Sequence, residues 1–181
     1  MRVIAGSAKG IHLSSVKGNT TRPIPDRIKG SLFNILADVI PDSQVIDLYA
    51  GTGAIGIEAL SRGAKSCIFV ENDRSAIQII KKNLELTKLQ ADARVLPYDV
   101  FEIDPYLEKD NVVVDVIFAS PPYPLLEKKI ILGWSPGSIF LFLHQTHSPP
   151  GRSYHISTQK NGFCGDAQSP CYRTIRLENV W

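Results

Sequence analysis

The sequence has little of what marks membrane proteins and disulfide-stabilised secreted proteins. Its 181 residues include three cysteines, which are too few for a disulfide framework. Its apolar runs are short and end in glycine, proline or a charged residue, whereas a transmembrane helix needs about 18 or more consecutive apolar residues. Residues 1–10 lack the apolar segment of a signal peptide. We therefore expect a protein of the reducing cytoplasm.

The sequence also lacks the polar bias that keeps a chain disordered. Hydrophobic residues make up 44% and charged residues 21%, which is typical of a globular protein with a sizeable core. The length suits one ordinary domain with a short extension. Nothing in the sequence demands more than a monomer.

Charge is distributed unevenly along the chain. Residues 1–30 contain six Lys or Arg and one Asp, a balance of +5, whereas the remainder contains 14 basic and 17 acidic residues, a balance of −3. A basic arm on a weakly acidic body suggests a polyanionic partner. Chance clustering on a solvated surface explains the counts equally well.

Predicted strands and helices alternate from residue 44 onward. The expected strands are 45–49, 67–70, 93–96, 112–119 and 138–143. The expected helices are 54–62, stopped by Gly63, and a helix to Thr87 that Asp73 caps. This alternation favours an α/β fold, in which helices cover both faces of a doubly wound parallel sheet.

The two ends of the chain depart from this alternation. Residues 1–15 predict a small hairpin, and Asp26 begins a predicted helix that reaches about Val39 before Pro41. The apolar face expected for that helix consists of Ile28, Leu32, Ile35, Leu36 and Val39. Residues 172–177 suggest a final edge strand. We therefore divide the chain into a basic extension, 1–40, and a main domain, 41–181.

The segment Asp47-Leu-Tyr-Ala-Gly-Thr-Gly53 joins a buried strand to a helix. Glycines at such a turn let backbone amides approach a ligand at the helix N-terminus. The string Gly51-Thr-Gly53-Ala-Ile-Gly56 matches the dinucleotide fingerprint, but a lone match is weak. Asp47 would repel a pyrophosphate and suits a cationic ligand such as the amino end of S-adenosylmethionine.

Further polar residues follow the other predicted strands. Glu71 ends the second strand, where an acid can accept both hydroxyls of a ribose, and Asp99 follows the third. Ligands of open sheets bind beyond the carboxyl ends of the strands, so we expect these acids to share one site, with Asp99 beside an adenine. The alternative is a glycine turn that only packs a helix, with solvated acids around it.

Ser120-Pro-Pro-Tyr123 follows the fourth predicted strand. Two prolines fix the backbone and remove two N–H donors, so the Ser120 hydroxyl and the Pro121 carbonyl can face a substrate as acceptors. The Tyr123 ring can stack on a planar base. Two acceptors that bind an exocyclic amine favour a localised lone pair aimed at an electrophile. The alternative is a rigid turn with a packed tyrosine.

Histidines and cysteines near the C-terminus do not form a metal motif. They are His144, His147, His155, Cys164 and Cys171. Neither His-x-x-His nor Cys-x6-Cys is a standard zinc spacing, so we expect no metal site.

Asp47-to-Gly53 together with Ser120-to-Tyr123 resembles the S-adenosylmethionine-dependent amino-methyltransferases. Three blocks resemble more narrowly the bacterial 16S rRNA guanine-N2 methyltransferases of the RsmD type: residues 1–6 with Lys9-Gly10, residues 21–29 with Leu32-Phe-Asn34, and residues 45–64. The likeness is close over residues 1–123 and thin beyond them. It implies a Rossmann-like sheet of about seven strands, mostly parallel with the last strand antiparallel, and a small N-terminal hairpin.

The resemblance also implies roles for single residues. Those implied to bind S-adenosylmethionine are Asp47, Tyr49, Ala50, Gly51, Gly53, Glu71, Asn72, Asp99 and Val100. Those implied to act at the transferred methyl group are Ser120, Pro121, Pro122 and Tyr123. Those implied to meet the phosphates of 16S rRNA, or of a partly assembled small subunit, are Arg2, Lys9, Arg22, Arg27 and Lys29.

The chain departs from the family at Ser120, where the family normally has Asp. Serine still accepts a hydrogen bond but does not take a proton at neutral pH. Since serine is common there in enzymes that methylate the exocyclic amine of cytosine, three hypotheses stay open. The protein methylates guanine N2 in 16S rRNA, or it methylates cytosine or adenine of RNA or DNA. The third hypothesis is a weakly active cofactor-binding RNA module in ribosome assembly.

Overall fold

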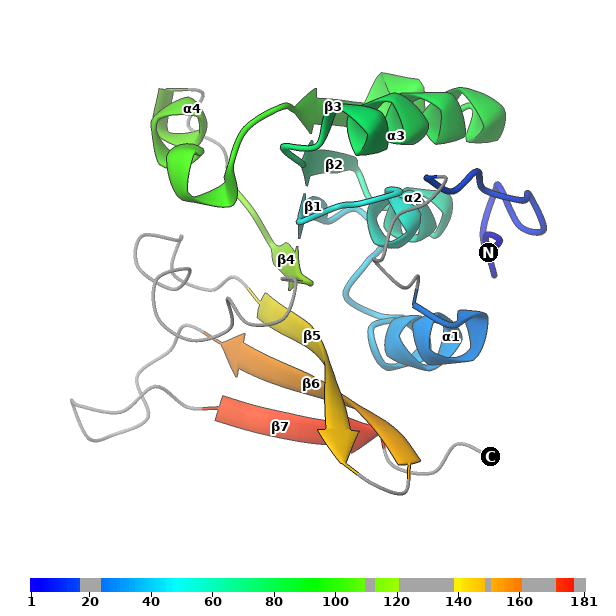
Figure 1. Ribbon diagram of the computed structural model, residues 1–181, viewed down its shortest axis with the longest axis vertical. Coiled ribbons are helices and arrows are strands. Elements are labelled where there is room, and N and C mark those ends of the chain that lie inside the picture. The colour runs from blue at the N-terminus through cyan, green and yellow to red at the C-terminus, as the bar shows by residue number, and fades with distance from the viewer. Residues whose placement is uncertain (17–23, 110–112, 121–138, 149–150, 161–171, 178–181) are drawn as a thin grey trace.

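The computed structural model describes residues 1–16, 24–109, 113–120, 139–148, 151–160 and 172–177. Four parallel strands form the centre of the sheet (Figure 1). They are β1 (Gln44–Leu48), β2 (Ser66–Val70), β3 (Ala93–Leu96) and β4 (Val116–Ala119). Their order is β3-β2-β1-β4, so the direction in which strands are added reverses between β1 and β4. The α/β class expected from the sequence is confirmed.

One helix precedes β1, and the others connect the strands. They are α1 (Asp26–Ile35), α2 (Ala54–Ser61), α3 (Arg74–Thr87) and α4 (Asp104–Lys109), with short 3-10 turns η1 (Gln90–Asp92) and η2 (Val100–Glu102). Asp73 caps α3 as expected, since its Oδ1 accepts a hydrogen bond from Ala76 N at 2.8 Å. No helix among the described residues is long and apolar enough to cross a membrane.

Three further strands extend the sheet beyond β4. β5 (Ile139–Ser148) runs parallel to β4, β6 (Gly151–Lys160) is antiparallel to β5, and β7 (Tyr172–Leu177) is antiparallel to β6. β5 is longer than the expected strand 138–143, and it pairs along its whole length with β6, which the sequence did not predict. One antiparallel strand at the end of the sheet was expected, and two antiparallel pairings are found, so that detail is not confirmed.

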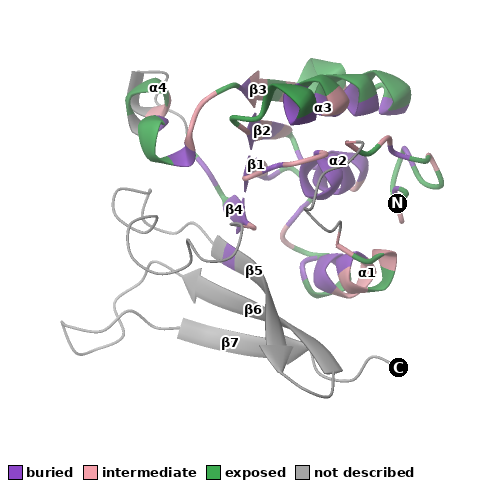
Figure 2. Cartoon of the chain, in the orientation of Figure 1, coloured by how far each residue is buried: buried purple, intermediate pink, exposed green. Residues whose placement is uncertain are grey.

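The strands place alternate residues on opposite faces of the sheet, and nearly every residue of β1 and β4 is buried (Figure 2). Val45, Phe69 and Phe118 belong to the larger hydrophobic cluster, which α1, α2 and α3 cover. Ile46 and Ile117 point to the other face, into a smaller cluster. All of these side chains are at least 98% buried, so the central strands are enclosed on both sides as continuous apolar runs require.

α1 ends earlier than the sequence predicts. The helix stops at Ile35, and the chain reverses through turns in which Ala37 N donates to Asn34 O and Val39 N donates to Leu36 O. Ile35 is 48% exposed, while Leu36 is in the core. The prediction that Ile35 shares the buried face is therefore wrong, because the buried face of this segment consists of Lys29, Leu32, Phe33 and Leu36.

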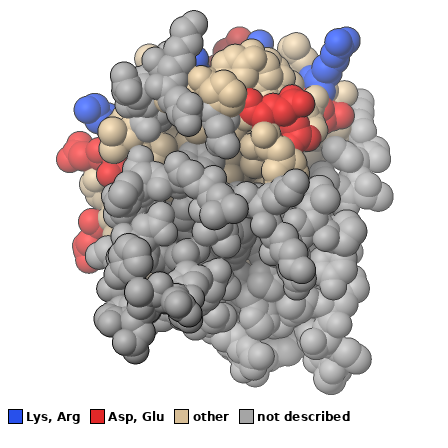
Figure 3. Space-filling model, turned by 90° about the vertical axis from the view of Figure 1, so that its left-hand side faces the viewer, with Lys and Arg blue, Asp and Glu red and all other residues tan. Residues whose placement is uncertain are grey.

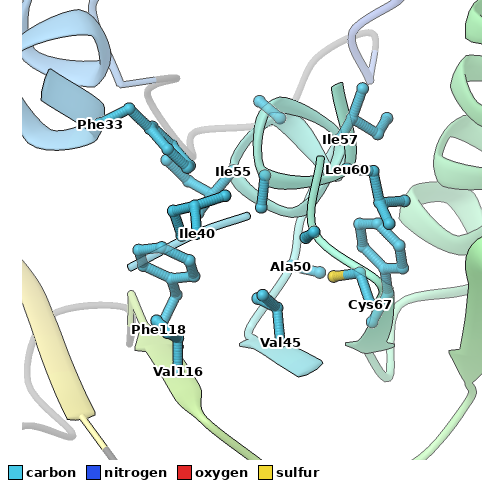
Figure 4. Packing of buried hydrophobic residues seen from close by; sticks show 14 of the residues in the cluster. Phe33, Ile40, Val45, Ala50, Ile55, Ile57, Leu60, Cys67, Val116 and Phe118 are labelled. Atoms are coloured by element: carbon cyan, nitrogen blue, oxygen red, sulfur yellow. The ribbon is translucent and has the colours of Figure 1, made fainter. Parts of the chain in front are cut away.

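Phe33 packs α1 against the sheet (Figure 4). Its ring lies 5.6 Å from that of Phe118 on β4, centroid to centroid, and the Arg62 guanidinium lies 5.2 Å from the Phe33 centroid. The fully buried Phe33 thereby links α1, α2 and β4.

The N-terminal segment, residues 1–16, packs against α2 and α3. Arg2 and His12 form one antiparallel bridge, which is the reduced form of the expected hairpin. Val3, Ala8 and Leu13 enter the larger cluster. Gly6 has φ +84° and touches α2 so closely that a Cβ would lie 1.6 Å from Ser61 O. Only glycine fits there.

Candidate active site

The candidate site lies where β1, β2, β3 and β4 end. Because the four strands are parallel, the residues that follow them meet at one edge of the sheet. Leu48 pairs with Ala119, so the next residues, Tyr49 and Ser120, stand side by side at the reversal between β1 and β4. Open α/β sheets bind their ligands at this reversal.

The turn that follows β1, residues 49–53, has an unusual backbone. Tyr49 has φ 58°, Gly51 φ 58° and Gly53 φ 76°, all in the left-handed region. A tyrosine there stores strain of about 1–3 kcal/mol, which persists only where the surroundings hold it. Ala50 N donates to Val70 O at 3.0 Å, and Gly53 N donates to Ala50 O at 2.8 Å. We call residues 49–53 the glycine turn.

Glu71 holds the glycine turn from the end of β2. Its Oε2 accepts a hydrogen bond from Gly51 N at 2.7 Å, and its Oε1 accepts from Asn72 N and Asp73 N, each at 3.0 Å. Its carboxylate thus has a role in shaping the turn that the sequence did not predict.

Asn72 and Asp99 are joined across the ends of β2 and β3. Asn72 Nδ2 donates to Asp99 Oδ2 at 3.2 Å, and Asp99 Oδ1 accepts from Phe101 N at 3.0 Å, which caps η2. Val100, in η2, is buried in the smaller cluster. The structure therefore brings together the predicted residues from β1, β2 and β3.

Asp47 lies beneath α2 and is only 2% exposed. Its Oδ2 accepts a hydrogen bond from Gly56 N at 2.9 Å, and among the described residues no cationic side chain pairs with it. Burial raises the pKa of Asp47 from 3.8 to about 7; the Gly56 hydrogen bond lowers it and the Glu71 charge raises it. A buried carboxyl with so few partners would be stabilised in its charged form by a cationic ligand.

Gly56 allows α2 to lie directly on β2 above Asp47. A Cβ at Gly56 would be 2.3 Å from Phe69 Cε1 and 2.7 Å from Cys67 Sγ. The absence of a side chain at Gly56 thus brings its N–H within reach of the Asp47 carboxylate.

Two buried hydroxyls mark the reversal between β1 and β4. Tyr49 OH and Ser120 Oγ are inaccessible to solvent and have no hydrogen-bond partner among the described residues. Burial, and then the Asp99 charge, raise the pKa of Tyr49, so its hydroxyl stays protonated. Unpartnered buried hydroxyls are costly and are expected where a ligand supplies the missing bonds. Pro121, Pro122 and Tyr123 lie outside the described residues.

Comparisons with known proteins identify the family of this chain. The family model described as "Conserved hypothetical protein 95" matches residues 1–131. "Putative rRNA methyltransferase YlbH" of Bacillus subtilis is 42% identical over 132 residues, 73% of this chain and 72% of that protein. The chain belongs to the RsmD-type family of S-adenosylmethionine-dependent methyltransferases.

A curated sequence and a solved structure, both from Escherichia coli, support this assignment to the RsmD-type family. "Ribosomal RNA small subunit methyltransferase D" is 37% identical over 140 residues, which are 74% of this chain and 69% of that protein. The solved structure of "Putative methyltransferase yhhF" is 31% identical, covers 97% of both chains and superposes with a TM-score of 0.69.

The basic residues expected to meet RNA have different environments. Lys9 and Arg27 are exposed, and the exposed Arg2 pairs with Asp26 at 3.4 Å. Arg22 lies outside the described residues. The side on which α4 lies, seen in Figure 3, carries both acidic and basic side chains over its described part, so it is not a uniformly basic face.

Lys29 does not fit the role predicted for it. It is 0% exposed, its Nζ lies 3.1 Å from Glu58 Oε2, and it donates to Arg2 O at 2.7 Å. The prediction that Lys29 meets RNA phosphates is wrong for this structure, because the ammonium group is enclosed between α1, α2 and the N-terminal segment.

Glu58 and Asn83 are important residues that sequence reasoning missed. Both are fully buried on helix faces that are mostly apolar. The Glu58 carboxylate pairs with Lys29 and Arg62 and accepts hydrogen bonds from Ile4 N and Ala5 N. A lone charge inside the apolar segment 54–60 was the available signal for Glu58. No group of three or more possible metal-binding side chains occurs in the described part of the chain.

Proposed function

We propose that this protein transfers a methyl group from S-adenosylmethionine to the exocyclic N2 amine of a guanine in small-subunit rRNA. Membership of the RsmD-type family supports methyl transfer. Two relatives that bear rRNA methyltransferase names support an rRNA substrate. The guanine and its N2 amine rest on the resemblance of residues 1–64 to the guanine-N2 methyltransferases.

The residues of the candidate site suit the cofactor. The glycine turn offers close backbone approach, and Asp47 is a buried carboxylate without a cationic partner among the described residues, which suits an ammonium group. Glu71 would hold the ribose, and Asp99 with Asn72 the adenine side. When bound, S-adenosylmethionine supplies an electrophilic methyl group, and the protein supplies position.

The single observation that carries the proposal is the pair of buried, unpartnered hydroxyls of Tyr49 and Ser120. Ser120 Oγ can accept a hydrogen bond from an exocyclic amine and orient its lone pair. The Pro121 carbonyl is proposed as the second acceptor and the Tyr123 ring as the stacking surface. A base inside a helix is inaccessible, so the target nucleotide must lie in a loop or be flipped out.

We also propose that the basic extension 1–40 contacts RNA and that 41–181 forms the methyltransferase domain, with a sheet of the seven-stranded methyltransferase type. Lys9 and Arg27 are exposed and suit phosphate contacts, with Arg2 and Arg22 beside them in the sequence. Lys29 is left out of this surface because it is buried.

Ser120 favours a second candidate, methylation of an exocyclic amine of cytosine or adenine. Serine in place of the family's aspartate supplies an acceptor without a negative charge. A weakly active RNA-binding module is the remaining alternative.

The test is methyl transfer from labelled S-adenosylmethionine to small-subunit particles that lack their native methylations, followed by nucleoside analysis. Label in N2-methylguanosine is the expected result. Label in a methylated cytidine or adenosine would replace the substrate by the second candidate. Cofactor binding without transfer would leave the RNA-binding module.

A further inference from the structure

Asn83 is a fully buried amide on the core face of α3. Its exposed fraction is 0%, and its neighbours Ile80 and Leu84 belong to the larger hydrophobic cluster. An amide in an apolar setting is costly unless its polar atoms are hydrogen-bonded. The partners of Asn83 therefore show what the amide is for.

Asn83 bonds to two segments that are far apart in the sequence. Its Nδ2 donates to Ser14 O at 3.1 Å and to Thr52 O at 2.9 Å, while its Oδ1 accepts from Ser14 N at 2.7 Å. Ser14 belongs to the N-terminal segment, and Thr52 belongs to the glycine turn. One side chain thus satisfies backbone groups of both.

A second contact joins the same two segments directly. Thr52 Oγ1 donates to Met1 Sδ at 3.8 Å. Thr52 is held at its carbonyl by Asn83 and at its hydroxyl by Met1. The glycine turn is therefore bonded to the N-terminal segment directly through Met1 and indirectly through Asn83.

We propose that Asn83 is a positioning residue that sets the glycine turn for cofactor binding by tying it to the N-terminal segment. The proposal rests on the proposed function, because it takes the glycine turn as the cofactor site. Linkage makes the effect reciprocal: a ligand that orders the glycine turn also strengthens docking of the N-terminal segment.

The test compares Asn83→Ala with Ser61→Ala as the matched control. Ser61 also bonds the N-terminal segment, through Ala5 O at 2.6 Å and Ala8 N at 3.0 Å, but at the end of α2 away from the glycine turn. Calorimetric titration with S-adenosylhomocysteine should show about tenfold weaker binding for Asn83→Ala, because a hydrogen-bonded constraint on the turn is lost. Ser61→Ala should bind like the wild type even where its thermal stability falls equally.

Hydrogen exchange gives a readout that a merely structural role would not move. S-adenosylhomocysteine should slow exchange of the Ser14 amide in the wild type and not in Asn83→Ala. Equal binding by the two variants, or a Ser14 amide indifferent to the ligand, would overturn the proposal. If Asn83→Ala does not fold, Asn83→Leu, which keeps the volume on this apolar face and loses the amide, takes its place.

Failure of the proposed function is distinguishable from failure of this inference. If the wild type does not bind S-adenosylhomocysteine, the cofactor assignment fails. Amide hydrogen exchange of the ligand-free proteins then tests the role of Asn83. If Asn83 holds the turn, the Ser14 and Gly53 amides both exchange faster in Asn83→Ala than in the wild type. Faster exchange at Ser14 alone would show that Asn83 does not hold the turn.

Discussion

The buried carboxyl of Asp47 should make the stability of the protein fall as pH rises toward neutrality. Burial raises its pKa from 3.8 to about 7, so between these values the folded state binds a proton that the unfolded state does not. A shift of about 3 units corresponds to about 4 kcal/mol of stability, which is present below pH 4 and is lost progressively as pH rises to about 7. Asp47→Asn removes this titration while keeping an oxygen that can accept from Gly56 N.

The assay is chemical unfolding of the wild type and Asp47→Asn at a series of pH values from 4 to 8. The free energy of unfolding of the wild type relative to that of the variant should decline by about 4 kcal/mol between pH 4 and pH 7 and then level off. Asp115→Asn is the matched control, since Asp115 is an exposed carboxylate that also accepts one backbone bond, from Gln44 N at 2.8 Å. A constant difference between wild type and Asp47→Asn from pH 4 to 8 would refute the reasoning.

The same carboxyl links cofactor binding to protons. An ammonium group against Asp47 would lower its pKa, so binding at pH 6 should release a proton. Calorimetry in two buffers of different ionisation enthalpy measures that release, and Asp47→Asn should abolish it. Full proton release in the variant would show that another group titrates.

Three further changes test other parts of the structure. Gly56→Ala should destabilise the protein by about 2 kcal/mol, because a Cβ there would overlap Phe69. Gly30→Ala on α1, where a Cβ would make an ordinary contact with Ile4 Cγ2 at 3.8 Å, should stabilise it by about 0.5 kcal/mol; thermal unfolding measures both. Lys29→Met should lower the free energy of unfolding by about 3 kcal/mol, because Glu58 keeps a buried charge, yet it should leave the salt dependence of RNA binding unchanged. Arg27→Ala should lower the slope of the logarithm of the RNA-binding constant against the logarithm of the salt concentration by about one. Ser120→Asp should raise methyl transfer severalfold if serine only weakens the enzyme; a fall would show that Ser120 is matched to its own substrate.

Local signals were sufficient for most of the central fold. β1, β2 and β3 appear within one residue of their predicted bounds, as does α2, and each contains a short apolar run. The cap at Asp73 followed from its place before α3. The end of α1 could not be predicted, because Leu36, Val39 and Ile40 continue the helical spacing although the chain forms turns there.

The candidate site was predictable as a set of residues but not as a set of contacts. Glycine spacing and acids at strand ends placed Asp47, Glu71 and Asp99 at one edge. The hydrogen bond from Gly51 N to Glu71 could not be predicted from the sequence, because it depends on the left-handed conformation of the glycine turn. The burial of Lys29 could not be predicted either, because its partner Glu58 lies 29 positions away and nothing local distinguishes it from a surface lysine.

The contacts of the N-terminal segment impose an order on folding. Its polar partners, Glu58, Ser61 and Asn83, lie 53 to 69 positions further along the chain. During synthesis the segment leaves the ribosome before α2 and α3, so its partners are absent until those helices have followed. Its apolar residues therefore stay exposed to chaperones and to other nascent chains for longer than the apolar residues of two elements that are adjacent in sequence and pack on each other.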